Sequence, residues 1–453
     1  MTDALVSYLK THTDEAQSLL EQLCRQPSIV AQNLGMDEAA DLVKALLDDA
    51  GFSTQILRVE GAPPAVYGEL EGRSPFTLLL YNHYDVQPPD PLDLWDSPPF
   101  EPTVRDDKLY ARGVSDNKGE IATRLAAIRA LLATDGELPI TIRWIIEGEE
   151  EVGSPHFAAL AEQYADLLRA DGCLWEGSGF DSEDRPDITL GTKGLLYVQY
   201  EVQAMARDAH SGGAATLPSA AWRLVQALAS LRGPDGRVRI PGFYDDVLAP
   251  TQAQLEVLAD QTDMEDLLRK MYDIEEFVDG LTGLPLRKRQ AFSPTSNIAG
   301  LLSGYTEEGV KTVLPARAMA KMDFRLVPDQ DPQDILRKLR AHLDAEGFDD
   351  IQVTDLGGAE PVVTPIEHPF VQRIIDIAAS FSDKKPSISP ITGGTLPLLG
   401  PLRRYVGVPG LSAPGNAGYW ASGAHAPNEH VRLADLTRAV RFNCHMFEGL
   451  AAD

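Results

Sequence analysis

The chain of 453 residues has few cysteines and few basic residues for its length. Cys24, Cys173 and Cys444 are widely spaced in apolar settings, which argues against a disulfide framework and against a thiolate metal cluster. Lys and Arg number 40 against 68 Asp and Glu, a formal net charge of −28. Nucleic acids and anionic membranes bind basic surfaces, so neither is expected as a partner. We expect any metal to be held by carboxylate and imidazole groups.

Long apolar runs are also missing. No stretch is long enough to span a bilayer, and Met1–Leu5 lacks the basic region and apolar segment of a secretory leader. We therefore expect a cytoplasmic protein. The hydrophobic fraction of 43% is sufficient for a packed interior, and the length predicts two to three domains.

The most informative stretch present is acidic. Glu147–Ser154 reads EGEEEVGS and directly follows the apolar run Ile140–Ile146, which predicts a buried strand. Carboxylates crowded at a strand end oppose each other's ionisation, so they either fan into solvent or share cations. Taken alone, such a run is typical of a solvated turn. Candidate ligands elsewhere in the chain favour a metal site.

Those other candidates also follow apolar segments. The segment Phe76–Tyr81 is apolar on both faces and precedes His83 and Asp85, whose alternation puts both side chains on one face. One imidazole nitrogen could then bind metal while the carboxylate orients the ring; the alternative is a hydrogen-bonded structural histidine. Asp116 precedes a predicted helix, of which it would otherwise be the N-cap. Glu176 closes a further apolar segment.

Strands and helices alternate through residues 1–194, which predicts a parallel sheet with these side chains at the carboxyl ends of its strands. The pattern changes in residues 195–358, where Ala318–Leu326 alternates as in a sheet covered on one face. The first pattern returns in residues 359–453. We therefore predict an α/β catalytic domain, 1–194 and 359–453, interrupted by a smaller α+β domain, 195–358.

One helix of the inserted domain is predicted over residues 218–231. Its periodicity places Trp222, Val225, Leu228 and Leu231 on the buried face. Residues 239–290 are mixed, with an acidic helix expected near 264–277, and their role is not evident from the sequence.

The ordered motifs resemble those of the co-catalytic zinc amidohydrolases, which include carnosinase-like cytosolic dipeptidases, carboxypeptidase G, acetylornithine deacetylase and succinyl-diaminopimelate desuccinylase. The resemblance covers nearly the whole chain and implies a zinc-peptidase-like mixed sheet flanked by helices. It also implies an inserted lid through which subunits form a homodimer. The stretches that carry it are His83-x-Asp85, Asp116-Asn117, Glu150-Glu151-x-Gly-Ser154, Glu176, His210-Ser-Gly212 and Gly423-Ala-His425.

The resemblance implies two divalent metal ions per chain. One would be held by His83, Asp116 and Glu176, and the other by Asp116, Glu151 and His425, with Asp116 bridging. Nitrogen and oxygen ligands suit zinc and also admit manganese or cobalt. In the family the peptide bond after the bridging aspartate is cis, which is expected here after Asp116.

Catalytic roles follow from the same resemblance. Glu150 takes the general-base position, although the adjacent Glu149 leaves the frame ambiguous from composition alone. Asp85 would orient His83. His210 resembles a histidine that reaches the active site of the partner subunit and stabilises the oxyanion; considered by itself, it is a surface histidine at a strand end.

Four residues are implied as substrate contacts. Arg325 resembles the arginine that binds a substrate carboxylate, for which a forked guanidinium is suited. Asn297, Gly394 and Thr395 are weaker contacts by the same resemblance. Thr392 stands where dipeptidases usually have an acidic residue before Gly-Gly, so recognition of a free amino terminus is an open question.

The preferred function is metal-dependent hydrolysis of an amide bond in a small carboxylate-bearing substrate. A dipeptide is the preferred substrate. Hydrolysis of an N-acyl amino acid, by a deacylase or desuccinylase, is the alternative within the class. A catalytically silent metal or amino-acid binding protein would not need Glu150, and a nucleotide-binding protein would need a glycine-rich phosphate loop after the first strand. The chain keeps the glutamate and lacks the loop.

Overall fold

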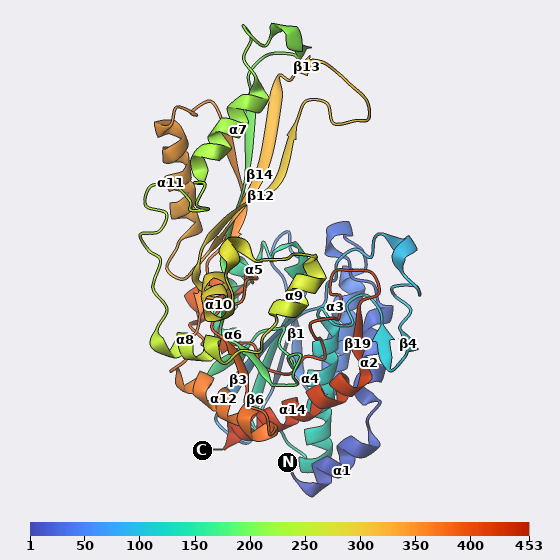
Figure 1. The fold of residues 1–453 in the computed structure, drawn as a ribbon. Coiled ribbons are helices and arrows are strands. Elements are labelled where there is room, and N and C mark those ends of the chain that lie inside the picture. Colours follow the sequence, from blue (N-terminus) through green and yellow to red (C-terminus); the bar gives the residue numbers. More distant parts are fainter. Residues whose placement is uncertain (453) are drawn as a thin grey trace.

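The computed structural model describes residues 1–452 and arranges them in a main unit and an elongated inserted unit (Figure 1). Both termini lie in the main unit. Its hydrophobic core takes residues between 5 and 190 and between 362 and 450. A separate core, in the inserted unit, takes residues between 196 and 351. The chain thus leaves the first core near residue 190 and returns to it near residue 362.

The main unit is built on a mixed sheet with the strand order β1-β2-β6-β3-β7-β18. Neighbours among β6, β3, β7 and β18 are parallel, whereas β1, β2 and β6 pair antiparallel. The α/β class is confirmed, but the parallel arrangement expected of the first part holds only from β6 to β18. A short connection joins β1 to β2 and lets the chain reverse, while parallel neighbours need a longer crossover. The strands are β1 (Ser53–Leu57), β2 (Ala65–Leu70), β3 (Thr77–His83), β6 (Thr141–Glu147), β7 (Gly172–Leu174) and β18 (Gly410–Leu411).

Helices enclose this sheet. The helix α4 is buried along most of its length, and α2 and α14 pack against it. Two of its buried charges are paired, since Arg124 Nη2 lies 2.8 Å from Glu120 Oε1, and the buried ammonium group of Lys118 donates to the carbonyls of Leu23 and Gln26. The helices of the main unit are α1 (Asp3–Thr11), α2 (Glu15–Arg25), α3 (Met36–Asp49), α4 (Lys118–Asp135), α5 (Phe157–Gln163), α6 (Ala165–Leu168), α12 (Pro369–Phe381), α13 (Leu399–Pro401) and α14 (Leu433–Ala451).

Short strands complete the main unit and its junction with the inserted unit. They pair as β4 with β5, β5 with β19, β8 with β17 and β9 with β16. Their bounds are β4 (Thr103–Arg105), β5 (Lys108–Tyr110), β8 (Asp187–Thr189), β9 (Gly191–Thr192), β16 (Val362–Val363), β17 (Ser387–Ser389) and β19 (His430–Arg432).

The inserted unit contains an antiparallel sheet with the order β12-β14-β10-β15. The predicted alternation in β14 is confirmed, because its buried positions face the core and α7 packs against it. A short ladder of β11 and β13 lies at the far tip (Figure 1). The elements are β10 (Gly194–Gln203), β11 (Ala209–His210), α7 (Ala220–Leu231), β12 (Thr295–Ser303), β13 (Val313–Leu314), β14 (Arg317–Leu326), α11 (Pro332–Ala345) and β15 (Gln352–Ala359).

The predicted burial of Trp222 and Val225 is wrong. Their side chains are 68% and 41% exposed, and α7 instead buries Leu224, Leu228 and Leu231 against the sheet. Successive helical residues are rotated by about 100°, so a helix that faces the sheet with Leu224 and Leu228 turns Trp222 and Val225 outward. An exposed apolar surface is left on this helix.

The segment between residues 239 and 290 links the two units. It contains α8 (Gln252–Ala259), α9 (Glu265–Tyr272) and α10 (Gly283–Phe292), so the acidic helix ends earlier than predicted. A small apolar cluster joins Leu258 and Phe292 to Ile391 of the main unit. Figure 1 shows α9 and α10 between the main sheet and the inserted sheet.

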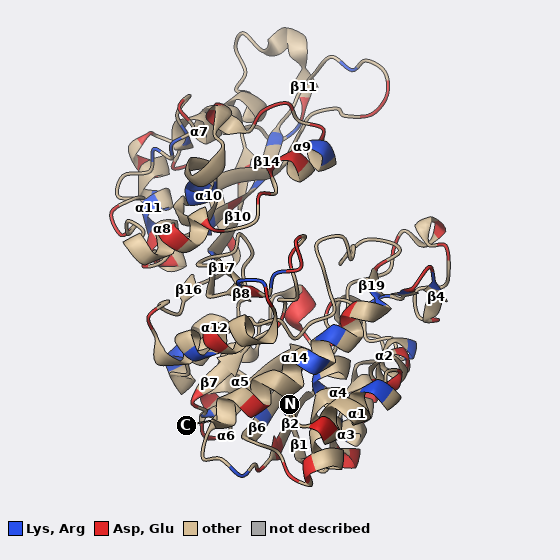
Figure 2. Ribbon diagram, turned by 60° about the horizontal axis from the view of Figure 1, so that its bottom comes forward, with Lys and Arg blue, Asp and Glu red and all other residues tan. Residues whose placement is uncertain are grey.

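Acidic and basic residues occur on both units (Figure 2), and α10 and α11 of the inserted unit each carry several basic residues. Cys24, Cys173 and Cys444 are buried free thiols. Within the described residues, no helix combines the length and hydrophobicity that a membrane crossing requires. The cytoplasmic location stays a prediction.

Candidate active site

The central strands bring the candidate residues to one edge of the main sheet. β3 and β6 are parallel and pair His83 with Glu147, so the segments that follow them emerge at the same edge. Asp116 lies just before α4, and Glu176 follows β7 by two residues. Glu147 itself is a structural residue, because its buried carboxylate accepts hydrogen bonds from Tyr81 Oη (2.7 Å) and from Oγ (2.9 Å) of Ser154, the last residue of the acidic turn Glu147–Ser154.

His83 and His425 face opposite oxygens of one carboxylate. His83 Nε2 lies 3.1 Å from Asp116 Oδ1 and 3.0 Å from Glu176 Oε2. His425 Nε2 lies 3.1 Å from Asp116 Oδ2 and 3.2 Å from Glu151 Oε2. The structure therefore brings together all five residues predicted as metal ligands, with Asp116 in the middle. The N-cap alternative for Asp116 is not found, since Asn117 occupies that position.

Asp85 connects His83 to the acidic turn. His83 Nδ1 lies 3.1 Å from the carbonyl oxygen of Asp85 and 3.3 Å from its Oδ1. The Asp85 carboxylate also accepts hydrogen bonds from the backbone amides of Glu150 (3.3 Å) and Glu151 (3.0 Å). The Asp85 side chain thus holds both the imidazole of His83 and the backbone of the acidic turn in place.

This arrangement fits a divalent cation. With the Nδ1 proton directed to Asp85, the Nε2 lone pair of His83 faces the oxygens of Asp116 and Glu176. Lone pairs held about 3 Å apart repel unless a cation lies among them. Among the described residues, Glu176 Oε2 is buried and has no hydrogen-bond partner. A donor set of imidazole nitrogen and carboxylate oxygen is suited to zinc, manganese or cobalt.

The structure separates the three successive glutamates by their contacts. Glu149 turns away from the centre, because its carboxylate accepts hydrogen bonds from the amide (2.8 Å) and Nδ1 (2.9 Å) of His156. Glu150 instead has an oxygen within 4.8 Å of donor atoms of His83 and Glu176. Burial, followed by the negative charge of Glu176, raises the pKa of Glu150 to about 9. Glu151 approaches His425, as described above.

Burial and neighbouring charges also shift the pKa values of Asp116, His425 and Glu176. Burial works against ionisation of Asp116, but when no cation is bound the protonated imidazoles of His425 and His83 donate hydrogen bonds that hold its pKa below the ordinary value. Contacts with Asp116 and then Glu151 raise the pKa of His425 to about 10. Burial raises the pKa of Glu176 to about 6, with His83 acting in the opposite direction. The site is thus a compact cluster of coupled charges.

Glu429 is a supporting residue that sequence reasoning missed. It is fully buried, and its carboxylate accepts hydrogen bonds from Arg112 Nη1 (2.8 Å) and the amides of Gly113 (2.9 Å), Ser115 (2.8 Å) and Asp116 (3.1 Å). Its backbone also lies four positions after His425. One short segment therefore supplies a candidate ligand and fixes the loop of another. The Asp116–Asn117 peptide bond in that loop is cis, as expected.

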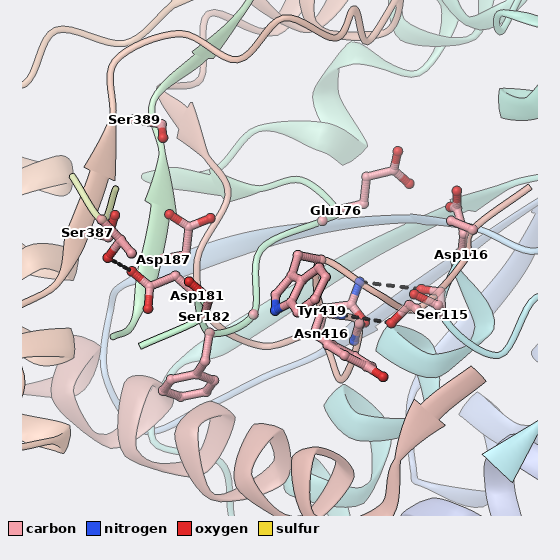
Figure 3. Close-up of a pocket in the computed structure, with 18 of the residues that line it drawn as sticks. Ser115, Asp116, Glu176, Asp181, Ser182, Asp187, Ser387, Ser389, Asn416 and Tyr419 are labelled. Carbon is pink, nitrogen blue, oxygen red and sulfur yellow. Dashed lines mark hydrogen bonds between the residues drawn. The ribbon is translucent and has the colours of Figure 1, made fainter. Parts of the chain in front are cut away.

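A cavity of about 730 Å³ opens beside the cluster. Figure 3 shows Asp116 and Glu176 at one end and Asp187 and Ser387 at the other. Tyr419 lies along its wall. The space beside the candidate ligands is large enough for a dipeptide-sized molecule.

A family model described as peptidase family M20/M25/M40 matches residues 79–449. The chain belongs to this family. The resemblance inferred from the motifs is therefore confirmed, and the match extends from β3 through the inserted unit to α14.

Curated relatives carry dipeptidase names. Human Beta-Ala-His dipeptidase is 34% identical over 290 residues, which cover 62% of this chain and 56% of that protein. The Cys-Gly metallodipeptidase dug1 of Schizosaccharomyces pombe is 28% identical over 412 residues, covering 86% of this chain and 83% of the relative. The match therefore spans little more than half the length of the human relative.

Solved structures of the peptidase family match both units. The M20 family metallo-carboxypeptidase Sso-CP2 from Sulfolobus solfataricus has a TM-score of 0.91 and 36% sequence identity, covering 97% of this chain and 99% of its own. Human carnosine dipeptidase 1 has a TM-score of 0.82 and 25% identity, covering 99% of each chain. Such coverage shows that the inserted unit belongs to the shared architecture.

In this M20/M25/M40 family member, the predicted substrate contacts lie at the junction of the two units. Arg325 Nη1 donates a hydrogen bond to Thr395 Oγ1 (2.8 Å), and the carbonyl of Gly394 accepts one from the amide of Lys193 (3.0 Å). Asn297 Nδ2 donates to Asp323 Oδ2 (2.9 Å) on the neighbouring strand. The structure brings Arg325, Gly394 and Thr395 together and leaves Asn297 exposed beside them.

His210 is not brought to the carboxylate cluster of its own chain. It is exposed on β11, at the tip of the inserted unit, with Nε2 3.2 Å from Thr312 Oγ1. Figure 1 shows this tip, labelled by the paired strand β13, at the end of the inserted sheet away from the main sheet.

Proposed function

We propose that the protein is a metal-dependent dipeptidase that hydrolyses the amide bond of a small peptide with a free carboxylate. The observation that carries the proposal is Asp116, which presents one oxygen to His83 and the other to His425 between two sets of further donors. Relatives named Beta-Ala-His dipeptidase and Cys-Gly metallodipeptidase support the same class of substrate.

In the proposal, His83, Asp116 and Glu176 hold one ion, and Asp116, Glu151 and His425 hold the second. Zinc is the proposed metal, with manganese and cobalt admitted by the same ligands. When bound, such ions polarise the scissile carbonyl and make water a stronger acid. The carboxylates that crowd this edge of the sheet would then be neutralised by the ions they share.

Glu150 is the proposed general base. Its carboxylate lies at the cluster and, among residues 1–452, has no hydrogen bond that would divert it, unlike Glu149. It takes a proton from the attacking water and later delivers the proton to the leaving amine. Arg325 is proposed to bind the carboxylate of the substrate, with Gly394, Thr395 and Asn297 around it.

A homodimer through the inserted unit completes the proposal. β12 is an edge strand of the inserted sheet and exposes Ile298, Leu301 and Leu302, while α7 exposes Trp222 and Val225. An unpaired edge strand beside exposed apolar side chains is a surface that a second copy can cover. The position of His210 at the tip supports a role in the active site of that second copy.

The substrate class is tested with matched panels of free dipeptides and N-acyl amino acids. Purified protein is loaded with zinc, manganese or cobalt, and released amine is quantified for each compound. Hydrolysis of dipeptides at rates well above those of N-acyl amino acids is expected. The reverse order would identify a deacylase, and hydrolysis of neither panel by any metal form would contradict the proposed function.

The substitution Glu151→Ala is expected to remove one of the two bound metal ions. Wild-type protein should hold about two divalent ions per chain, and Glu151→Ala about one, because this carboxylate belongs to the second group alone. Elemental analysis of metal-saturated, dialysed protein measures the ratio. Glu162→Ala, at an exposed position of α5, is the control and should retain both ions. A maximum of one ion in the wild type, unchanged in Glu151→Ala, would contradict the bridged site.

A further inference from the structure

Lys193 occupies the junction between the main and inserted units. It lies between β9 and β10 and is 3% exposed. Its carbonyl accepts a hydrogen bond from Thr395 Oγ1 (2.7 Å), and its Nζ donates one to the carbonyl of Ser293 (2.7 Å). The residue thus connects the glycine turn of the main unit with the segment that enters β12.

The charge of Lys193 is not balanced by an anion within the described residues. In the part of the chain that the structure describes, a single carbonyl bonds its ammonium group and no carboxylate pairs with it. Burial, followed by the cation of Arg325, lowers the pKa of Lys193 to about 8. Asp323 lies 3.8 Å from Arg325 and offsets only that cation. A buried ammonium beside a second cation is unfavourable unless an anion is shared between them.

A cavity of about 750 Å³ lies against both cations. Ser296 also lines it, and the buried hydroxyl of Ser296 has no hydrogen-bond partner among residues 1–452. The cavity lining therefore includes cationic and hydroxyl donors. It also includes an apolar and aromatic wall, formed by Leu268, Tyr272, Phe277, Val278 and Leu286. The rest of the lining includes the charged residues Arg232, Arg237, Arg289, Asp235 and Asp279.

We propose that Lys193 and Arg325 together clamp the C-terminal carboxylate of the substrate, and that the apolar wall receives the side chain of the C-terminal residue. The assignment of Lys193 rests on the proposed function. A carboxylate has enough lone pairs to accept from a guanidinium fork and an ammonium group at once. The unpaired hydroxyl of Ser296 adds a further donor to this subsite.

The test compares the dipeptide Ala-Leu with its C-terminal amide, which lacks the negative charge. Lys193→Gln keeps a donor for the Ser293 carbonyl and removes the cation. We expect it to lower kcat/KM for Ala-Leu by about 10-fold or more, mainly through KM, and for the amide by less than about 3-fold. Lys193→Arg, which keeps the charge, should restore most of the preference for the acid. Lys288→Met, at an exposed position of α10, is the control and should match the wild type.

An equal loss of kcat/KM for Ala-Leu and for its amide in Lys193→Gln would overturn the proposal. Lys193 would then have only a structural role, as a link between the two units. If that variant does not fold, Arg325→Gln decides: Lys193 alone should still favour the acid over the amide, and complete loss of the preference would overturn the assignment. If the wild type hydrolyses neither compound, the proposed function fails, and calorimetric titration of the same pair tests the subsite. Tighter binding of the acid than of the amide supports it, and equal binding contradicts it.

Discussion

Glu150→Gln is expected to lower kcat by at least ~100-fold while the protein keeps its full metal content. Glutamine has nearly the same shape as glutamate but cannot accept a proton, so the substitution removes proton transfer and preserves the packing. Activity against a hydrolysed dipeptide and elemental analysis of the same preparation give the two measurements. Loss of one ion in Glu150→Gln would contradict the assignment and make Glu150 a ligand.

Glu149→Gln is the matched control for this prediction. The Glu149 carboxylate is occupied by the amide and imidazole of His156, so its replacement should affect the start of α5 more than catalysis. A modest change in melting temperature with nearly unchanged kcat is expected. If Glu149→Gln abolished turnover and Glu150→Gln did not, the assignment of the general base would be wrong.

His210→Ala is expected to lower turnover by about 100-fold or more with metal content unchanged. A donor aimed at the developing oxyanion stabilises the transition state by roughly 3 to 4 kcal/mol. Because His210 lies at the tip of the inserted unit, away from the carboxylate cluster of its own chain, the effect should be exerted in a second subunit. Kinetic assays and sedimentation analysis of the same sample test both parts.

Mixing inactive subunits gives a sharper result. A dimer of one His210→Ala and one Glu150→Gln subunit has one site with both defects and one site with neither. Random exchange at equal concentrations should therefore restore about a quarter of wild-type activity. Mixing Glu150→Gln with Glu176→Ala is the control, because both defects then disable their own sites and no activity should return. No recovery in verified mixed dimers, or full activity of an obligate monomer, would contradict the arrangement.

The helices and strands with strong local signals were predictable. The bounds of α11 and α12 can be read from the sequence, because each helix begins at a proline that suits the first helical turn and continues with regular apolar spacing. The alternation of β14 identified its buried face for a similar reason. In these segments the local pattern and the tertiary packing favour the same structure.

Other features depend on contacts that the local sequence does not contain. The outward position of Trp222 follows from how α7 docks on the sheet, since its apolar residues surround more than one face. The strands β8, β9, β16 and β17 have two or three residues each, which is too short for periodicity. Their partners lie far away in the chain.

Some residues of the candidate site were predictable from the sequence, and the roles of others required the structure. Strand ends predicted that His83, Glu151 and Glu176 would meet, because the carboxyl ends of parallel strands share an edge. The position at a parallel strand end is wrong for Asp116, which follows β5 of a separate antiparallel sheet and reaches the site just before α4. The separate roles of Glu149 and Glu150 required the structure, since His156 lies seven residues beyond the former. The contacts of Glu429 were equally hidden, because its partners are backbone amides more than 300 positions away.

The divided core of the main unit determines the order in which the protein can mature during translation. Residues 196–351 form their own core and can fold once they have left the ribosome. The main core needs residues between 362 and 450, and the second group of donors needs His425. If His425 binds the second ion as proposed, nascent chains that stop before this segment can hold at most the first ion. The proposed second site would then be completed only after the chain has returned to the core that it began.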